Sequence, residues 1–204
     1  MTEGKRIAVF ISGRGSNFKA IMEEIKKGTI KGRIVLVVSD NPDAPGLSYA
    51  RENNIECAVF KKKNSDSRSE YFIKIISELK MKNIELIILA GFMKILSPNI
   101  VGLYRNRILN IHPALLPSFT GEHAQKKALD HGVKYSGCTV HFVDEGVDSG
   151  PIIAQKTVPV KDGDTEQTLS ERILEKEHVI YPEAVRLFCD NKLSVKGRRV
   201  FTKL

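Results

Sequence analysis

Residues 7–17 read Ile7-Ala8-Val9-Phe10-Ile11-Ser12-Gly13-Arg14-Gly15-Ser16-Asn17, an apolar run followed by a glycine-rich turn. Apolar residues then recur at helical spacing, at Phe18, Ile21, Met22 and Ile25. This pattern predicts a strand, a tight turn and a helix. The backbone N–H groups of such a turn, together with the positive end of the following helix, can bind a phosphate.

The turn matches the common nucleotide-binding loops poorly. Phe18 stands where G-x-G-x-x-G requires its last glycine, and no Gly-Lys-Ser/Thr follows. We therefore expect a cradle for a phosphate monoester, built by Gly15, Ser16 and Asn17. An ordinary turn between a strand and a helix is the alternative interpretation.

Strands and helices alternate along the first half of the chain. Strands are expected at 34–38, 57–60 and 84–90, and helices at 47–53 and 71–79. This alternation predicts an α/β fold, a Rossmann-like, mostly parallel, doubly wound sheet with helices on both faces. Ligands of such sheets bind beyond the carboxyl ends of the strands. The glycine-rich turn and residues 91–96 and 110–113 all follow strands, so we expect them to share one edge.

The second half is less regular. It predicts a helix at 124–131, strands at 138–143 and 152–159, a long helix from 164 and a hairpin at 193–200. Pro182 is expected to kink or break the long helix. We expect a single domain over 1–204, with an N-terminal half at 5–105 and a C-terminal half at 106–200.

Asn110-Ile111-His112-Pro113 is the main candidate for chemistry. Asn110 and His112 lie two residues apart at the end of a strand, so their side chains should point to the same side. A later strand leads into the acidic, glycine-containing loop 144–150. If both strands end at the same edge, Asp148 can reach His112. The alternative is a strand end with an ordinary surface histidine.

Composition limits the class of protein. The chain has 204 residues, 42% of them hydrophobic, and no apolar run of membrane-spanning length. No signal-peptide pattern is visible, so we expect a soluble, cytoplasmic protein. Cys57, Cys138 and Cys189 are widely spaced and predict neither a disulfide framework nor a metal site. The net charge of +8 suits anionic partners without choosing among them.

Four segments together resemble the phosphoribosylglycinamide formyltransferases, a branch of the 10-formyltetrahydrofolate-dependent formyltransferase family. They are the turn 12–17, Leu89-Ala90-Gly91-Phe92-Met93-Lys94-Ile95-Leu96, Asn110-Ile111-His112-Pro113-Ala114-Leu115-Leu116-Pro117, and the loop that contains Asp148. The order of these motifs matches from about residue 5 to 195. The resemblance implies direct, metal-free transfer of a formyl group from 10-formyltetrahydrofolate to the glycyl amine of glycinamide ribonucleotide.

The resemblance also implies residue roles. Asn110 and protonated His112 would donate hydrogen bonds to the oxyanion, and Asp148 would raise the pKa of His112 above about 6.5. The implied substrate-binding residues are Gly15, Ser16, Asn17 and Glu177. The implied folate-binding residues are Arg68, Met93, Lys94, Ile95, Leu96, Asn110, Asp144 and Val147. For the apolar residues of 93–96, packing in the core is the alternative.

Other functions remain open at this point. Formyltetrahydrofolate deformylase and methionyl-tRNA formyltransferase share the Asn, His and Asp pattern, but each normally has a further domain for which we expect no room in 204 residues. A basic nucleic-acid-binding module without catalysis is the alternative from another class. The resemblance favours small-molecule partners, no nucleic acid, no membrane, and a monomer or homodimer.

Overall fold

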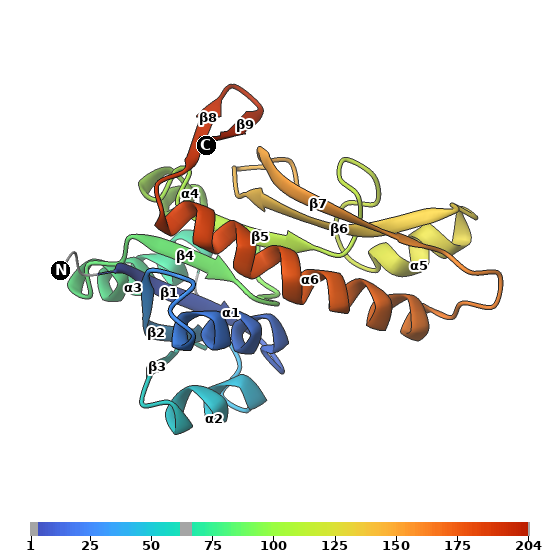
Figure 1. The fold of residues 1–204 in the computed structure, drawn as a ribbon. Helices are drawn as coiled ribbons and strands as arrows, with labels where there is room; N and C mark the ends of the chain where they lie inside the picture. The colour runs from blue at the N-terminus through green and yellow to red at the C-terminus, as the bar shows by residue number, and fades with distance from the viewer. Residues whose placement is uncertain (1–3, 62–66, 204) are drawn as a thin grey trace. The chain divides into compact units, whose positions relative to one another are not determined.

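The computed structural model describes residues 4–61 and 67–203, and the chain divides into two compact units, Met1–Leu109 and Asn110–Leu204. Figure 1 shows both units as a ribbon. The expectation of a single domain remains a prediction.

The first unit is built on a parallel sheet (Figure 1). Its strands lie in the order β3-β2-β1-β4. They are β1 (Lys5–Ile11), β2 (Gly32–Ser39), β3 (Glu56–Val59) and β4 (Leu86–Leu89). The helices are α1 (Ser16–Lys26), α2 (Pro45–Glu52), α3 (Arg68–Met81) and α4 (Pro98–Leu103).

The sequence of β1 explains its central place. Residues 7–11 all have 0% exposure, so both faces of this strand are covered, as expected for a parallel sheet with helices on either side. The chain runs outward from β1 to β2 and β3, and later returns to add β4 on the other side. With right-handed crossovers, α1 and α2 lie on one face, the returning connection places α3 on the other, and this reversal creates a crevice beyond the ends of β1 and β4.

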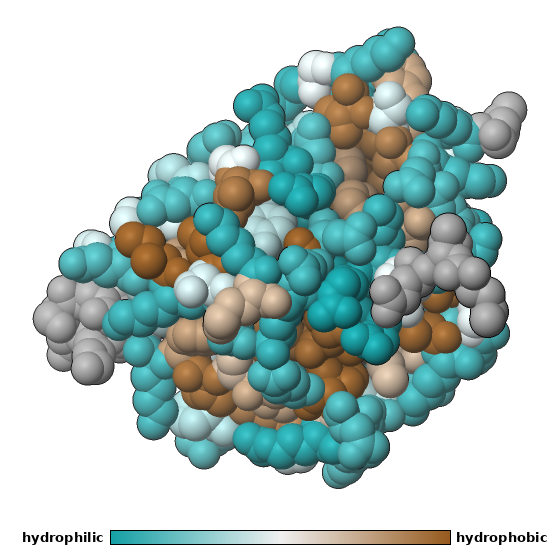
Figure 2. All heavy atoms as spheres, turned by 90° about the vertical axis from the view of Figure 1, so that its left-hand side faces the viewer, coloured by the Kyte–Doolittle hydropathy of each residue, from teal (hydrophilic) through white to brown (hydrophobic). Residues whose placement is uncertain are grey.

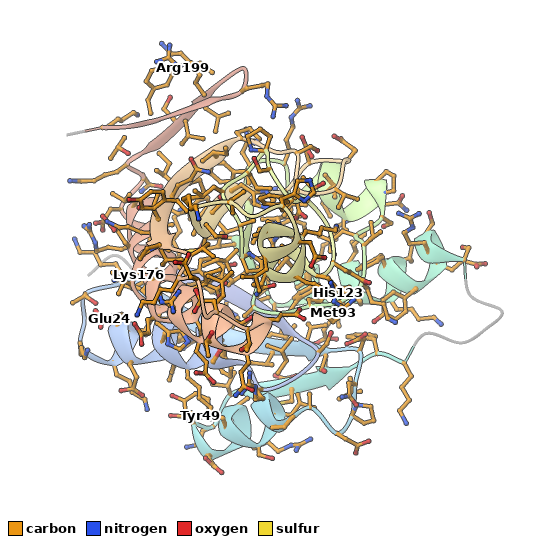
Figure 3. The ribbon with its side chains drawn as sticks, turned by 90° about the vertical axis from the view of Figure 1, so that its right-hand side faces the viewer. Glu24, Tyr49, Met93, His123, Lys176 and Arg199 are labelled. Atoms are coloured by element: carbon orange, nitrogen blue, oxygen red, sulfur yellow. The ribbon has the colours of Figure 1, made fainter. Side chains whose placement is uncertain are left out.

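The second unit is mixed. Strand β5 (Ile108–His112) enters it and is followed by α5 (Ala124–Asp130). β6 (Tyr135–Phe142) and β7 (Ile152–Pro159) are antiparallel, and α6 (Glu166–Cys189) packs along both (Figure 1). β8 (Leu193–Lys196) and β9 (Arg199–Thr202) form the expected hairpin, and Ile152 of β7 pairs in parallel with Arg199 of β9, which Figure 3 labels.

The predicted α/β class is confirmed, and of the kink or break expected at Pro182 the break is wrong. Pro182 does not break α6, which continues from Glu166 to Cys189 with Pro182 buried inside it. Proline removes one backbone hydrogen bond, and packing of the apolar face of a long helix can offset that loss. Among the described helices, none combines the length and apolar character needed to cross a membrane.

A few apolar side chains of the first unit reach solvent. Ile73 and Met81 of α3 are 55% and 69% exposed, and Leu103 of α4 is 39% exposed. Figure 2 shows apolar surface interrupted by hydrophilic side chains. Single apolar residues of this kind are ordinary on protein surfaces.

Candidate active site

The second unit brings an amide, two imidazoles and a carboxylate together. The Nδ1 atom of His112 lies 3.2 Å from Oδ2 of Asp148, and Nε2 of His141 lies 3.7 Å from Oδ1 of the same carboxylate. The Nδ2 atom of Asn110 lies 3.1 Å from Nε2 of His141. The expected contact between His112 and Asp148 is therefore present, and His141 is a further member of the cluster that was not predicted.

A short backbone segment completes this cluster. The carbonyl of Phe119 lies 2.8 Å from Nε2 of His112. The N–H of Gly121 donates to Oδ2 of Asp148 at 2.8 Å. Both nitrogens of His112 thus face oxygen acceptors, which hold the ring in one orientation.

The pKa of His112 is lowered, contrary to the expectation that Asp148 would raise it. The side chain is almost fully buried, and burial disfavours the imidazolium. The charge of Asp148 and the Phe119 carbonyl act in the opposite direction without overcoming that cost. The sequence shows the charged neighbour of His112 but not the burial of its side chain.

Asp148 is ionised at neutral pH. Burial alone would raise its pKa, but the neighbouring rings of His141 and His112 and the hydrogen bond from the Gly121 N–H lower it to about 2. A buried acceptor of this kind favours any step in which His112 gains a proton.

His141 fixes the orientation of Asn110. Its Nδ1 lies 2.8 Å from the carbonyl oxygen of Phe142, which can only accept, so we assign the ring proton to Nδ1. Nε2 then accepts a hydrogen bond from the Asn110 amide. Because an amide nitrogen carries two hydrogens, Asn110 keeps one donor for a ligand.

The loop after β6 is shaped by local contacts. Oδ1 of Asp144 accepts from the Ser149 hydroxyl at 2.6 Å and from the Gly146 N–H at 3.1 Å. Asp148 has φ 51, in the left-handed region. A Cβ on Gly150 would lie 1.8 Å from the Phe142 carbonyl oxygen, so only glycine fits where the loop rejoins the sheet.

The turn after β1 has the features of an anion site. Gly15 adopts φ 68, and α1 begins at Ser16 without a described side chain capping its first turn. The first N–H groups of a helix have no partner within the helix and carry partial positive charge. Asn17 is buried at 7% exposure, whereas Ser16 is partly exposed.

The loop after β4 lies beside this turn. The Ser12 N–H donates to the Gly91 carbonyl at 3.1 Å, so these two segments share an edge as expected. Met93, labelled in Figure 3, and Ile95 are 65% and 59% exposed, which excludes core packing for both side chains. Leu96, at 7% exposure, does pack in the core.

The remaining predicted residues lie in varied surroundings. Arg68 is exposed at the start of α3, and Lys94 is exposed in the loop after β4. Val147 is 51% exposed, and Glu177 on α6 is buried at 7%. In the described part of the chain, no group of His, Cys, Asp and Glu could hold a metal ion.

Comparison with known proteins gives this geometry a context. A family model described as formyl transferase matches residues 5–185. A phosphoribosylglycinamide formyltransferase from Escherichia coli (strain K12) is 42% identical over 189 residues, which cover 93% of this chain and 89% of that protein. The chain belongs to the formyl transferase family.

Solved structures with similar folds were also found. Glycinamide ribonucleotide transformylase 1 from Symbiobacterium toebii matches with a TM-score of 0.96 and 46% identity, covering 99% of this chain and 95% of that one. A formyltetrahydrofolate deformylase from Pseudomonas syringae pv. tomato matches with a TM-score of 0.92 but 23% identity, covering 98% of this chain and 66% of that one, which reflects the fold alone.

Some relatives of this formyl transferase are much longer. It is 46% identical over 191 residues to the trifunctional purine biosynthetic protein adenosine-3 of Drosophila pseudoobscura pseudoobscura, covering 93% of this chain and only 14% of that protein. The same unit thus occurs both as most of a bacterial protein and as a small part of a multifunctional one.

Proposed function

We propose that this formyl transferase moves the formyl group of 10-formyltetrahydrofolate to the glycyl amine of N1-(5-phosphoribosyl)glycinamide, a step of de novo purine (IMP) biosynthesis. The observation that carries the proposal is the cluster of Asn110, His112 and Asp148 in a chain that is 42% identical to a phosphoribosylglycinamide formyltransferase. An amide donor beside an imidazole–carboxylate pair suits acyl transfer to an amine.

In the proposed reaction, the amine nitrogen forms a bond to the formyl carbon, and negative charge develops on the formyl oxygen. The free N–H of Asn110 stabilises that oxyanion. Neutral His112, the form that burial favours, accepts the proton that the amine releases. The resulting imidazolium is stabilised by Asp148 at Nδ1, and its Nε2–H exchanges the Phe119 carbonyl for the oxyanion. The proton then passes to the folate nitrogen as the carbon–nitrogen bond to the donor breaks.

The binding roles follow the resemblance. We assign the substrate phosphate to Gly15, Ser16 and Asn17, because the turn and the start of α1 offer N–H donors. Glu177 would contact the ribose. The folate would bind through the following residues: Arg68, Met93, Lys94, Ile95, Leu96, Asn110, Asp144 and Val147.

The exposed Met93 and Ile95 side chains support the folate assignment, since apolar groups at a loop tip can cover an aromatic ring. Leu96 and Asp144 would act mainly through the backbone, because Leu96 is buried and Asp144 holds its own loop. We further propose that the reaction uses small molecules and no metal, that nucleic acid and membranes take no part, and that the protein works in the cytoplasm as a monomer or homodimer.

A spectroscopic transfer assay with 10-formyl-dideazafolate tests this function. We expect release of dideazafolate that depends on added glycinamide ribonucleotide. Release at the same rate without the ribonucleotide would indicate a deformylase instead. No release in either condition, with a folded protein, would reject both.

A further inference from the structure

The segment that joins β2 to α2 supports the turn after β1. Nδ2 of Asn41 donates to the Ser12 carbonyl at 3.2 Å, and the Gly46 N–H donates to the Gly13 carbonyl at 3.1 Å. The Ser12 hydroxyl donates to Oδ1 of Asp40 at 2.6 Å. Three hydrogen bonds thus hold Ser12 and Gly13, which lead directly into the proposed phosphate site.

The same group of residues also contacts the loop after β4. The hydroxyl oxygen of Ser12 accepts from the Met93 N–H at 2.9 Å. Nζ of Lys94 lies 3.6 Å from Oδ2 of Asp40. Oδ1 of Asp40 therefore accepts a hydrogen bond from the turn after β1, and Oδ2 faces the loop after β4, which is proposed to bind the folate.

The position of Asp40 is well defined. Its side chain is only 9% exposed, although its partner Lys94 is 46% exposed. The Ser39 hydroxyl accepts from the Asn41 N–H at 3.1 Å and donates to the Asn41 carbonyl at 2.8 Å, which attaches the segment to the end of β2.

Packing leaves little freedom between the segment and the turn. A Cβ on Gly46 would lie 2.6 Å from Cδ1 of Ile11 and 3.2 Å from the Gly13 carbonyl oxygen. A displacement of the segment that joins β2 to α2 would therefore also displace the turn after β1, because closely packed elements have few alternative arrangements.

We propose that Asp40 is a positioning residue that couples the two ligands, so that binding at Gly15–Asn17 strengthens binding at Met93–Leu96, and the reverse. This inference rests on the proposed function, which places the ribonucleotide phosphate on the turn and the folate on the loop. Whichever ligand binds first shifts this connected group through Ser12 and Asp40 toward the arrangement that the second ligand also prefers. By linkage, the effect has the same size in both directions.

Calorimetric titration of the full chain measures the coupling. Glycinamide ribonucleotide is titrated into the protein alone and into protein saturated with dideazafolate, which has no formyl group to transfer. The ratio of the two Kd values is the coupling factor. We expect about fivefold or more for the wild type, in the usual range for coupled sites.

Two variants of Asp40 separate coupling from general damage. Asp40→Ala removes both contacts, and we expect its coupling factor to fall to within about twofold of one, below that usual range. Asp40→Asn keeps an oxygen that can accept from Ser12 but loses the charge facing Lys94, so it should recover part of the factor. The matched control is Asp43→Ala, which removes an exposed carboxylate from the same segment and should keep the wild-type factor.

The outcomes distinguish the two proposals. A wild-type coupling factor of one, or an Asp40→Ala variant that keeps the wild-type factor, overturns the role of Asp40 while formyl transfer by the wild type continues. If the wild type neither transfers formyl nor binds the ribonucleotide, the proposed function fails and the role of Asp40 fails with it. Thermal unfolding shows whether each variant is folded. A general loss of stability would weaken both Kd values alike and leave the coupling factor, which is their ratio, unchanged.

Discussion

Asp148 receives contacts from both histidines of the cluster and from one backbone N–H. His112 lies against Oδ2 and His141 against Oδ1, while Gly121 donates to Oδ2. The carboxylate therefore influences both the proton on His112 and, through His141, the orientation of Asn110. Changes at these residues should affect the chemical step more than ligand binding.

His112→Ala should lower kcat by at least about 10²-fold, because it removes the group that accepts the amine proton. Asp148→Asn should lower kcat by a similar factor, since the imidazolium loses its counter-charge. Steady-state kinetics on folded variants measures both. Near-normal turnover in either variant would remove the role assigned to that residue.

Asp148 should also make stability depend on pH. Its pKa is lowered from 3.8 to about 2, so its ionised form contributes stability above pH 3.8 that is lost as the pH falls toward 2. The shift corresponds to about 2 kcal/mol as an order of magnitude. Urea unfolding of wild type and Asp148→Asn should therefore show a free-energy gap that narrows by about that amount between pH 5 and pH 2.

Groups that titrate in the same way in the wild type and in Asp148→Asn cancel when the two free energies of unfolding are subtracted. Asp43→Asn, which removes an exposed carboxylate outside the cluster, supplies the control. A gap between wild type and Asp148→Asn that stays constant over this range would contradict the low pKa of Asp148.

Individual residues also show where sequence reasoning reaches its limit. Asn110, His112 and Asp148 could be found because each follows a recognisable strand or lies in a distinctive loop. His141 was hidden within an apolar strand, and the contributions of Phe119 and Gly121 come from backbone atoms that every residue possesses. The direction of the His112 pKa depended on burial, which a sequence does not state.

Among the elements, the strand, turn and helix of residues 5–26 could be predicted closely, because apolar period and glycine placement agree there. Pro182 could not, since a proline normally argues for a helix end. Packing of the buried face of α6 outweighs that local preference. The local sequence pattern predicted an element correctly where the packing of that element favoured the same structure.

The loop after β6 gives a prediction about an element. Gly150→Ala would place a methyl group 1.8 Å from the Phe142 carbonyl, so the loop that contains Asp148 must shift. We expect a loss of about 1–3 kcal/mol in the free energy of unfolding, with reduced activity. Urea unfolding measures the stability change.

Gly163→Ala is the matched control for this substitution. Gly163 lies in the loop before α6, where an added Cβ meets nothing within 4 Å. It should leave both stability and activity nearly unchanged. Equal losses of stability in Gly150→Ala and Gly163→Ala would show that the contact between a Cβ at position 150 and the Phe142 carbonyl does not cause the loss.

For the whole molecule, the net charge of +8 leaves a nucleic-acid-binding module as the competing interpretation. If the charge serves small anionic substrates, excess duplex DNA at physiological salt should leave formyl transfer unchanged. Fluorescence anisotropy should then detect only weak, strongly salt-dependent binding. Tight, sequence-dependent binding without formyl transfer would support the competing interpretation.

The most direct measurement follows the formyl carbon itself. The protein is mixed with a folate donor carrying ¹³C in its formyl group, with and without glycinamide ribonucleotide, and the products are identified by mass spectrometry. We predict that the label appears in the formylated ribonucleotide, and that donor without ribonucleotide stays intact. Label recovered as free formate, whether or not the ribonucleotide is present, would contradict the account.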